Sequence, residues 1–465
     1  MMFMLHLQGG GSWLPRVSLL FGLVAVISGC AQNKTSLQSG FKLDSAEGTY
    51  QNQEKRVARE IKQISEVRNS TVRSAASRVP LRRPKGLDVR VGVLLPLTGR
   101  HALLGKSIYS AIELALFTVG AKNLVLLPRD TQGTPEGARI AARSAIDSGA
   151  EFLIGPVFSG SARAVAAEKR GTGIISLALT NDYQSSDVDS YVLGLLPGQR
   201  LSRIVSFAFS RGLRRFAYLL PEGAYGDVIA QAFQTAVIEA GGTIVRTARY
   251  SKDNQLSISR AVKRLANYDR RRSLWAEQKK ILARNPDPIS QKALRRLENR
   301  EALGRVGFDA VLLIEDGPAI TALAPLLPYY EIDIRRVRIL GISDWGERSI
   351  LREPAMNGAW YTSLSPSSVA KFVGKFKGIF GYSPNSLAPL AYDAGAIAAF
   401  LSAQNPPAFS NQMLTNSRGF SGSVGLFRFR KNGTVEHNFS VLEVTPEGAK
   451  EISPPPREFP MPAIN

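Results

Sequence analysis

Short apolar runs alternate with amphipathic helical patterns along the chain from residue 87 onward. The runs predicted as buried strands are Val89–Leu97, Leu124–Leu127, Phe152–Ile154, Gly173–Leu179, Arg215–Leu220, Thr243–Ala248, Ala310–Ile314 and Arg338–Gly341. Helical spacing of apolar residues is found in Ser107–Phe117, Pro135–Ser148, Ala162–Lys169 and Asp227–Ala240. Strands that alternate with helices of about ten to fifteen residues are typical of βαβ units and parallel sheets. We therefore predict an α/β fold with two doubly wound, Rossmann-like lobes.

A β-hairpin is expected near the C-terminal end. Leu426–Arg430 alternates apolar and basic residues, and Val435–Val444 is a second apolar stretch. Between them, Asn432-Gly433 is a dipeptide favoured in two-residue type I′ turns, in which both residues have a positive φ. The sequence therefore predicts two antiparallel strands joined by such a turn.

The N-terminus has the pattern of an export signal. Arg16 precedes the apolar run Val17–Ile27, which is too short for a transmembrane helix of about 20 residues. The segment Ile27-Ser28-Gly29-Cys30 resembles the lipobox of bacterial lipoproteins, and Cys30 is the one cysteine of the chain. The resemblance implies lipidation of Cys30 and a membrane anchor. Ala31 stands where an Asp favours inner-membrane retention in these lipoproteins, so an anchor in the outer membrane, facing the periplasm, is expected.

The chain divides into regions by composition. Residues 1–29 are the predicted lipoprotein signal peptide, and the polar residues 30–86 are the lipidated N-terminus and a flexible spacer. The two-lobed domain covers 87–450, with a basic helical insertion at 260–305, and a Pro-rich tail follows at 451–465. Lobe 1 is expected at about 87–197 and 364–421, and lobe 2 at about 198–363 and 422–450. No stretch after Cys30 is predicted to be long and apolar enough to span a membrane.

The chain is strongly basic, with 59 Lys and Arg against 38 Asp and Glu and a formal net charge of +21. A basic protein in the cytoplasm would suggest nucleic acid as a partner. Export argues against nucleic acid, and anionic lipid head groups, cell-wall precursors or an acidic protein remain as partners.

Catalytic and metal-binding patterns are not found. His101 and His437 are the histidines that follow the signal peptide, and neither has the spacing of a metal motif such as HExxH. No GxSxG nucleophile elbow occurs in the sequence. We predict a protein that is not an enzyme and needs neither a metal nor a cofactor.

Several segments together resemble type I periplasmic binding proteins of the leucine-binding kind. They occur in the expected order between about residues 88 and 450: Gly92-Val93-Leu94-Leu95-Pro96-Leu97-Thr98-Gly99, Arg129-Asp130-Thr131, Gly155-Pro156, Ser176-Leu177-Ala178-Leu179-Thr180-Asn181 and Tyr225-Gly226-Asp227. The resemblance implies two Rossmann-like lobes that close on a ligand.

The same resemblance implies a cleft for an amino-acid-like ligand. Ser159, Ala178 and Thr180 match the positions that hold the ligand carboxylate in that family. On the other lobe, Tyr225 is a candidate contact, and Asp316 or Asp344 could neutralise an ammonium group, although the aromatic walls of the family's site are missing. Helix capping and loop hydrogen bonds are an alternative role for the Ser159 and Thr180 hydroxyls.

The insertion and the sequence after it resemble another family more closely. An Arg-rich insertion, followed by Phe308-Asp309-Ala310-Val311 and by Pro325-Leu326-Leu327-Pro328-Tyr329-Tyr330, is similar to the C-terminal domain of outer-membrane lipoprotein activators of penicillin-binding proteins, the LpoA type. In those activators this domain is a docking module for a bifunctional peptidoglycan synthase, whose transpeptidase it stimulates.

The insertion at 260–305 is the predicted docking surface, with 14 Lys and Arg against 5 Asp and Glu. Clustered positive charge accelerates association with an acidic surface and makes binding sensitive to salt. The candidate docking residues are Arg270, Arg271, Arg272, Lys279, Lys280, Arg295 and Arg296. The alternative is a solvated helical pair whose apolar residues, such as Leu274 and Trp275, pack on the lobe.

Three functions follow from these observations. The first is a lipid-anchored regulator that binds and activates a bifunctional penicillin-binding protein. The second is a solute-binding lipoprotein of an ABC transporter for amino acids or related ligands. The third, a cell-wall enzyme, would need a catalytic group that the sequence does not contain.

Overall fold

The computed structural model describes residues 88–459 except 299 and 405–407. The chain divides into two units, residues 1–83 and 84–465. All the described residues belong to the second unit. The predicted signal peptide, Cys30, the spacer and the end of the tail lie outside the described residues.

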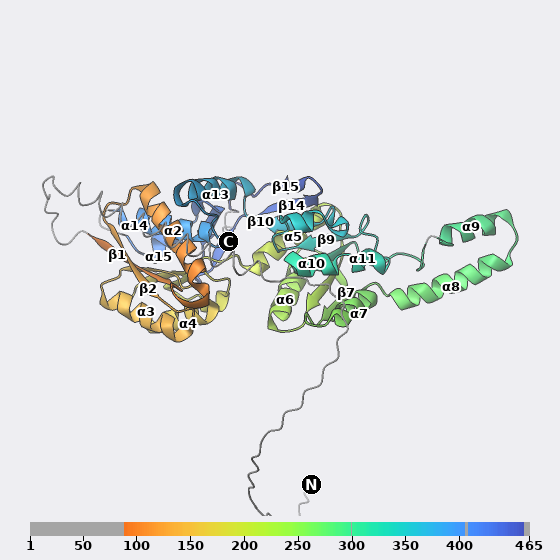
Figure 1. Cartoon of the computed structure of the whole chain (residues 1–465), viewed down its shortest axis with the longest axis horizontal. Coiled ribbons are helices and arrows are strands. Elements are labelled where there is room, and N and C mark those ends of the chain that lie inside the picture. The colour runs from red at the N-terminus through yellow and green to blue at the C-terminus, as the bar shows by residue number, and fades with distance from the viewer. Residues whose placement is uncertain (1–87, 299, 405–407, 460–465) are drawn as a thin grey trace, which may run out of the picture. The chain divides into compact units, whose positions relative to one another are not determined.

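The first lobe is built on a parallel sheet with strand order β2-β1-β3-β4-β5. Its strands are β1 (Val89–Leu95), β2 (Leu124–Asp130), β3 (Phe152–Ile154), β4 (Ile175–Ala178) and β5 (Ser190–Val192). Its helices are η1 (Gly99–His101), α2 (Ala102–Val119), α3 (Pro135–Asp147), α4 (Ser159–Glu168), η2 (Tyr183–Ser185), α13 (Pro366–Phe380), α14 (Ala388–Ser402) and α15 (Asn411–Leu414) (Figure 1). The predicted strands and helices of this region are therefore found, with small shifts at their ends.

Helices cover both faces of this sheet because successive residues of a strand point to opposite sides. On β1, Val91 and Val93 lie in a buried cluster with α2 and α14, whereas Leu94 lies in a second cluster with α3. Gly92 faces α3, where a Cβ atom would stand 2.9 Å from the Ala145 methyl group, so the close approach of α3 requires glycine. This is the predicted doubly wound arrangement.

The second lobe has a mixed sheet with strand order β15-β14-β10-β9-β8-β6-β7. Its strands are β6 (Arg215–Pro221), β7 (Thr243–Tyr250), β8 (Ala310–Leu313), β9 (Arg338–Gly341), β10 (Trp360–Ser363), β14 (Ser440–Thr445) and β15 (Gly448–Ser453). Its helices are α5 (Pro197–Ser210), α6 (Ala224–Glu239), α7 (Gln255–Leu265), α8 (Tyr268–Arg284), α9 (Pro288–Glu298), α10 (Gly317–Leu323), α11 (Leu326–Tyr329), α12 (Arg348–Leu351) and η3 (Pro354–Met356). Residues of α5 and α6 pack on one face, and residues of α7, α10 and α11 pack on the other.

The predicted C-terminal hairpin is correct only in its first half. β12 (Gly425–Phe429) pairs with β13 (Val435–His437), and β11 (Phe420–Gly422) completes a small antiparallel sheet. The prediction of one strand over Val435–Val444 is wrong, because the chain leaves this sheet after His437 and enters the second lobe as β14, antiparallel to β10. Phe427 and Val435 pack in the core of the first lobe, so the change of lobe lies after residue 437 rather than at 422.

The hairpin turn is not type I′. The Gly433 N–H donates to the Arg430 carbonyl (3.0 Å) and the Arg430 N–H donates to the Thr434 carbonyl (2.8 Å), which leaves a three-residue loop. Gly433 has a φ of 77°, whereas Asn432 does not adopt a positive φ. The Asn432 side chain instead accepts hydrogen bonds from the backbone N–H (3.1 Å) and hydroxyl (2.7 Å) of Thr434. The glycine alone supplies the left-handed residue, as in three-residue hairpin loops with a glycine bulge.

Helix α5 holds together the segments at which the chain changes lobe. Gln199 accepts a hydrogen bond from the His437 N–H (3.0 Å), just before the change to β14. Arg200 donates to the Thr362 carbonyl (2.6 Å) near the end of β10, and Arg203 donates to the Phe439 carbonyl (2.9 Å). The chain passes between the lobes three times, and α5 follows the first passage. These long-range hydrogen bonds connect α5 to the segments at which the chain passes between the lobes again, after β10 and before β14.

One described helical segment, Gly99–Val119, is long and apolar enough to cross a membrane by length and composition alone. The prediction that no such stretch follows Cys30 is therefore wrong on that criterion. Ile108 and Ile112 of this segment are fully buried in the first-lobe core with residues of α14. Burial in the protein core accounts for its apolar composition.

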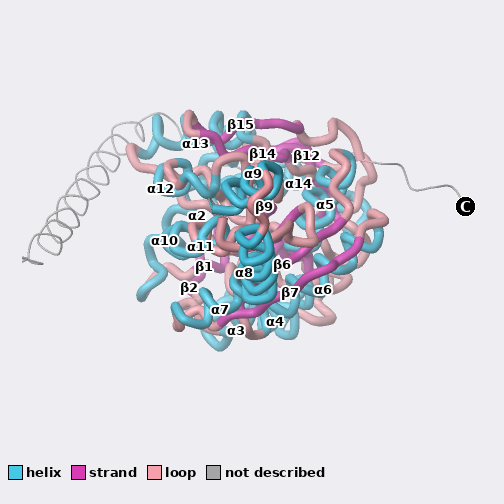
Figure 2. Tube along the Cα trace, turned by 90° about the vertical axis from the view of Figure 1, so that its right-hand side faces the viewer, coloured by secondary structure: helices cyan, strands magenta, loops and turns pink. Residues whose placement is uncertain are grey.

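The basic insertion forms a helical hairpin. Helices α8 and α9 pack against each other and extend from the second lobe (Figure 1). Figure 2 views the chain from that end, so that α8 and α9 point toward the viewer. The first residues of the predicted insertion belong to α7, whose Ala261 and Val262 are buried in the lobe core, so the projecting part begins only at α8.

Candidate functional site

The first-lobe half of the predicted ligand site is assembled. Ser159 opens α4 after β3, and Thr180 follows β4, so the parallel neighbours β3 and β4 bring both residues to the same edge of the sheet. The Ser159 Oγ and Thr180 Oγ1 atoms are 3.2 Å apart, within hydrogen-bond distance. Ala178 ends β4 and is buried. The two hydroxyls are thus brought together, and their mutual hydrogen bond fits the alternative role in holding the loops. Their binding of a ligand carboxylate stays a prediction.

The second-lobe candidates are more open. Tyr225, in the first turn of α6, is 51% exposed, and Asp316 and Asp344 are both exposed. Asp344 accepts a hydrogen bond from the Gly346 N–H (3.1 Å), which is a local turn contact. Burial raises the pKa of Tyr225, and the charge of Arg200 opposes this shift.

Arg200 is a cation that the sequence analysis missed. Burial lowers its pKa to about 10, and Tyr225 and Asp344 act on it in the opposite direction. Asp344 was expected to neutralise the ammonium group of a ligand. The positive charge of Arg200 partly neutralises Asp344 and so weakens its attraction for a ligand cation. No local signal marks Arg200, because its position follows from contacts with residues far along the chain.

Glu315, next to Asp316, was also missed and has a structural role. Its carboxylate is buried and accepts hydrogen bonds from the Tyr250 hydroxyl (2.6 Å) and from Lys252 Nζ (3.0 Å). A buried carboxylate needs such partners, since an unpaired one is costly. These contacts join the ends of β7 and β8 rather than facing a ligand.

A groove of about 730 Å³ lies beside the predicted site. Its walls come from residues 181–184, the first turn of α5, one face of α6, and Arg430 and Thr434 of the hairpin loop. Of the six predicted ligand contacts, only Tyr225 lines this groove. The groove and the Ser159–Thr180 pair are therefore not one preformed pocket.

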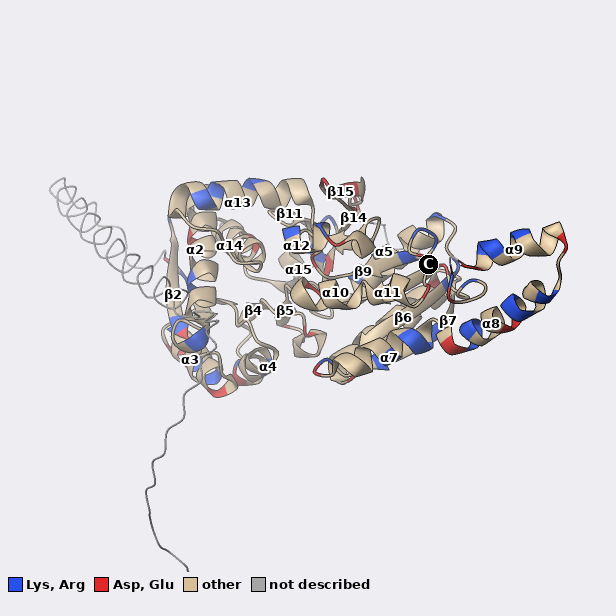
Figure 3. Cartoon of the chain, turned by 45° about the vertical axis from the view of Figure 1, so that its right-hand side comes forward, with Lys and Arg blue, Asp and Glu red and all other residues tan. Residues whose placement is uncertain are grey.

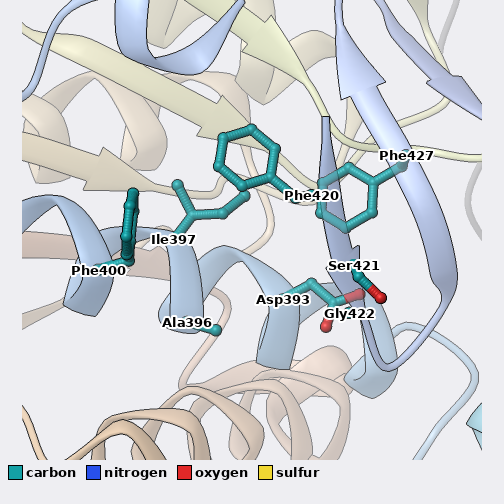
Figure 4. Close-up of a pocket in the computed structure, with 8 residues that line it drawn as sticks. All are labelled: Asp393, Ala396, Ile397, Phe400, Phe420, Ser421, Gly422 and Phe427. Carbon is teal, nitrogen blue, oxygen red and sulfur yellow. The ribbon is translucent and has the colours of Figure 1, made fainter. Parts of the chain in front are cut away.

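A smaller cavity of about 230 Å³ lies in the first lobe between α14 and β11 (Figure 4). Asp393 lines it beside Phe420 and Phe427, and burial raises the pKa of Asp393 to about 7. The carboxylate accepts backbone hydrogen bonds from Ser423 (2.6 Å) and Val424 (3.1 Å). These bonds hold the β11–β12 turn on α14, so we assign Asp393 a structural role.

Histidines and metal sites do not alter this picture. His437 is buried between the rings of Phe427 and Phe439, at centroid distances of 5.6 and 5.9 Å, and burial lowers its pKa to about 3. His437 is thus part of the core. Within the described ranges, no group of three or more His, Cys, Asp or Glu side chains is placed to hold a metal ion.

The candidate docking residues differ in their exposure. Arg271 is buried, and its guanidinium donates to the carbonyls of Ala266 (3.3 Å), Leu303 (3.2 Å), Gly304 (3.0 Å) and Glu331 (3.1 Å). The other six candidates are more accessible: Arg270, Arg272, Lys280, Arg295 and Arg296 are exposed, and Lys279 is partly exposed. Arg271 is therefore removed from the docking set.

Lys279 has a contact of its own within the hairpin. Its ammonium group lies 5.1 Å from the centroid of the Trp275 ring, and the Trp275 indole N–H donates to the Leu297 carbonyl (3.0 Å). Trp275 thus joins α8 to α9, whereas the alternative interpretation of the insertion expected it to pack on the lobe.

Comparisons with known proteins identify the fold. A family model described as periplasmic binding protein matches residues 88–269. A solved branched-chain amino acid ABC transporter periplasmic ligand-binding protein from Burkholderia xenovorans is similar with a TM-score of 0.57 and 17% identity, over 79% of this chain and 95% of that one. The chain has the α/β fold of type I periplasmic binding proteins, as predicted.

The curated relatives include an uncharacterised protein of Rickettsia prowazekii, 23% identical over 190 residues, and two groups with described functions. A Leu/Ile/Val-binding protein of Rhizobium johnstonii is 26% identical over 181 residues, which is 33% of this chain and 45% of the relative. A penicillin-binding protein activator LpoA of Vibrio cholerae is 23% identical over 254 residues, which is 50% of this chain and 37% of the relative. The chain matches less than half of the length of either relative. Both groups are binding or regulatory proteins rather than enzymes.

Proposed function

We propose that this chain is a lipid-anchored periplasmic regulator, with its anchor in the outer membrane, that binds and activates a bifunctional penicillin-binding protein. The observation that carries the proposal is the α8–α9 hairpin, which adds an exposed basic surface to the binding-protein fold (Figure 3). In this fold a ligand is held between the lobes. The hairpin belongs to the second lobe alone and is far in sequence from the Ser159–Thr180 pair, so it is not part of the predicted ligand site. The similarity to LpoA over half of this chain supports the proposal.

The state of the cleft also supports a regulatory rather than a transport role. Asp316 and Asp344 are exposed. Asp344 and Arg200 carry opposite charges that attract each other, and this attraction acts against the lowering of the Arg200 pKa by burial. A preformed amino-acid site would instead surround the ligand with apolar and aromatic walls and a few placed polar groups. No catalytic group is needed for this function, in agreement with the expected absence of enzyme activity.

Binding to the synthase tests the proposal. The chain from residue 32 onward is titrated into a purified bifunctional penicillin-binding protein of the same organism by calorimetry, at low and high salt. We expect saturable binding at micromolar concentration or tighter, weakened on the order of tenfold at high salt because an exposed basic surface is screened. Absence of binding at both salt concentrations would refute the proposed function.

A solute-binding lipoprotein of an ABC transporter is the second candidate, and the Ser159–Thr180 pair favours it. The two hydroxyls are 3.2 Å apart, and by the family resemblance they match positions that hold a ligand carboxylate in leucine-binding proteins. On this function, leucine, isoleucine or valine at 100 times its Kd would raise the free energy of unfolding by about 2.7 kcal/mol. The double variant Ser159→Ala/Thr180→Ala would lose that stabilisation.

On the regulatory function, we expect these amino acids to leave the melting temperature unchanged. Thermal denaturation of the unaltered chain and of the double variant, with and without each amino acid, makes the measurement. Stabilisation of the unaltered chain but not of the variant would establish the solute-binding function instead.

A further inference from the structure

The base of the α8–α9 hairpin is fixed to the second lobe. Arg271 is 7% exposed and binds four backbone carbonyls that belong to segments on both sides of the hairpin. The Tyr268 hydroxyl donates to Glu301 (2.7 Å), and the Tyr268 ring packs edge-on against Tyr330. The hairpin is therefore a preorganised projection, and preorganisation lowers the entropy lost on binding.

The outward face of α8 combines charged and apolar side chains at helical spacing. Positions 270, 274, 277, 281 and 284 follow one another at intervals of three or four, so they form one stripe along the helix. Leu274 is 44% exposed and Ile281 48%, and arginines stand at both ends of the stripe. At the start of α9, Ile289 is 82% exposed. The alternative interpretation of the insertion, a solvated helical pair, expected its apolar residues to be buried against the lobe. Leu274 and Ile281 are instead exposed.

The exposed basic side chains of the hairpin lack ion-pair partners within the part of the chain that the structure describes. Among the described residues, no ion pair involves the exposed members of this set, which are Arg270, Arg272, Lys280, Arg284, Lys292, Arg295 and Arg296. Blue segments, which mark Lys and Arg, accordingly recur along both helices in Figure 3. The exposed Leu274 and Ile281 are thus flanked by exposed basic side chains. Protein interfaces commonly have this composition, with an apolar centre and a charged rim.

We propose that the outward stripe of α8, namely Arg270, Leu274, Glu277, Ile281 and Arg284 together with the flanking Arg272 and Lys280, docks on an acidic protein surface that has an apolar centre. We refer to these residues as the α8 stripe. The proposal rests on the function proposed above, for which the partner is the penicillin-binding protein. The cations accelerate encounter and orient the partners, and Leu274 and Ile281 supply the short-range contact.

Two other occupants fit the surface less well. A second copy of this chain carries a net charge of +21 and repels a basic surface at long range. An anionic membrane would have to accommodate Asp287 at the tip of the hairpin. The Asp287 carboxylate accepts backbone hydrogen bonds from Ile289 (3.0 Å) and Ser290 (2.9 Å), which hold it in its charged form, and Glu277 lies within the stripe itself. An acidic protein surface avoids the first penalty. Its charges are also discrete, so it can place apolar or basic groups opposite Glu277 and Asp287, which a uniformly anionic membrane does not.

Paired variants of the chain from residue 32 onward test the proposal. Lys280→Glu/Arg284→Glu changes the charge of the α8 stripe, and Leu274→Ser/Ile281→Ser removes its apolar groups. The matched controls lie on exposed positions of the first lobe: Lys371→Glu/Lys377→Glu on α13 for charge, and Phe117→Ser/Ile379→Ser for apolar area. Each variant is titrated against the purified penicillin-binding protein at low and high salt. Circular dichroism confirms that each variant is folded.

Both α8 variants are expected to raise the Kd at least about tenfold, while both controls stay within about twofold. The charge variant should also lose part of the salt dependence, which the apolar variant keeps. If the unaltered chain binds and the α8 variants bind equally well, the docking surface is wrong although the regulatory function stands. If the unaltered chain does not bind, both proposals fail. Binding of the unaltered chain, but not of the charge variant, to phosphatidylglycerol vesicles with unchanged synthase binding would overturn the proposal in favour of a membrane surface.

Discussion

Replacing Arg271 with alanine is expected to lower the free energy of unfolding by about 2–4 kcal/mol, because four backbone carbonyls lose their common donor and a cavity is left. Arg271 is buried and closes the base of the α8–α9 hairpin through the carbonyls of Ala266, Leu303, Gly304 and Glu331. Burial lowers the pKa of Arg271, and the carbonyl dipoles hold its charge in place of a carboxylate.

The neighbours of Arg271 supply matched controls for this experiment. Arg270 and Arg272 have the same side chain and adjacent positions on α8, and both are exposed. Arg270→Ala and Arg272→Ala should each change the stability by no more than about 0.5 kcal/mol. Urea unfolding followed by circular dichroism compares the three variants. Equal stability of all three would contradict the structural role of Arg271.

Asp393 is expected to make the first lobe less stable as the pH rises. Most carboxylates have the opposite effect, because their pKa is lower in the folded protein than in the unfolded chain. Burial raises the pKa of Asp393 to about 7, well above the ordinary value of 3.8 for an aspartate. The folded state therefore holds a proton that the unfolded state has released, between about pH 4 and about pH 7. The contribution of Asp393 to the free energy of unfolding is therefore largest at the acidic end of this window. It is lost as the pH rises through the pKa that Asp393 has in the folded protein.

The Asp393→Asn variant isolates this effect. Asparagine has nearly the same shape, remains neutral, and leaves the close contact with Gly422 in place, where a Cβ atom would stand 2.4 Å from the carboxylate. From about pH 5 to about pH 8, we expect the unaltered chain to lose about 2–3 kcal/mol relative to the variant. Urea unfolding of both proteins at the two pH values gives this difference. A constant difference across the range would show that Asp393 does not titrate in it.

Much of the fold could be predicted from local patterns. Short buried runs such as Phe152–Ile154 are bounded by turn residues and alternate with amphipathic helices, which is enough to indicate a doubly wound sheet. The assignment of the C-terminal strands failed because Val435–Val444 looks continuous in sequence. Its division after His437 depends on pairing with β12 and then with β10, which are partners far along the chain.

The candidate site shows the same distinction between local and long-range information. Ser159 and Thr180 were assigned to one site through the family resemblance, and in the structure both follow neighbouring parallel strands. Arg200 could not be found, since its environment is set by Thr362, Tyr225 and Asp344 across the second lobe. Arg271 was grouped with two exposed arginines, yet its spacing from Tyr268 and Trp275 on one helix face was a signal that it points inward.

Stimulation of the synthase tests the central claim most directly. The rate of peptide cross-linking by a purified bifunctional penicillin-binding protein is measured with increasing amounts of the chain from residue 32 onward, and with the Lys280→Glu/Arg284→Glu variant. We expect a saturable increase in cross-linking with the unaltered chain and a curve shifted at least about tenfold to higher concentration with the variant. A cross-linking rate that stays the same at every concentration of the unaltered chain would contradict the account.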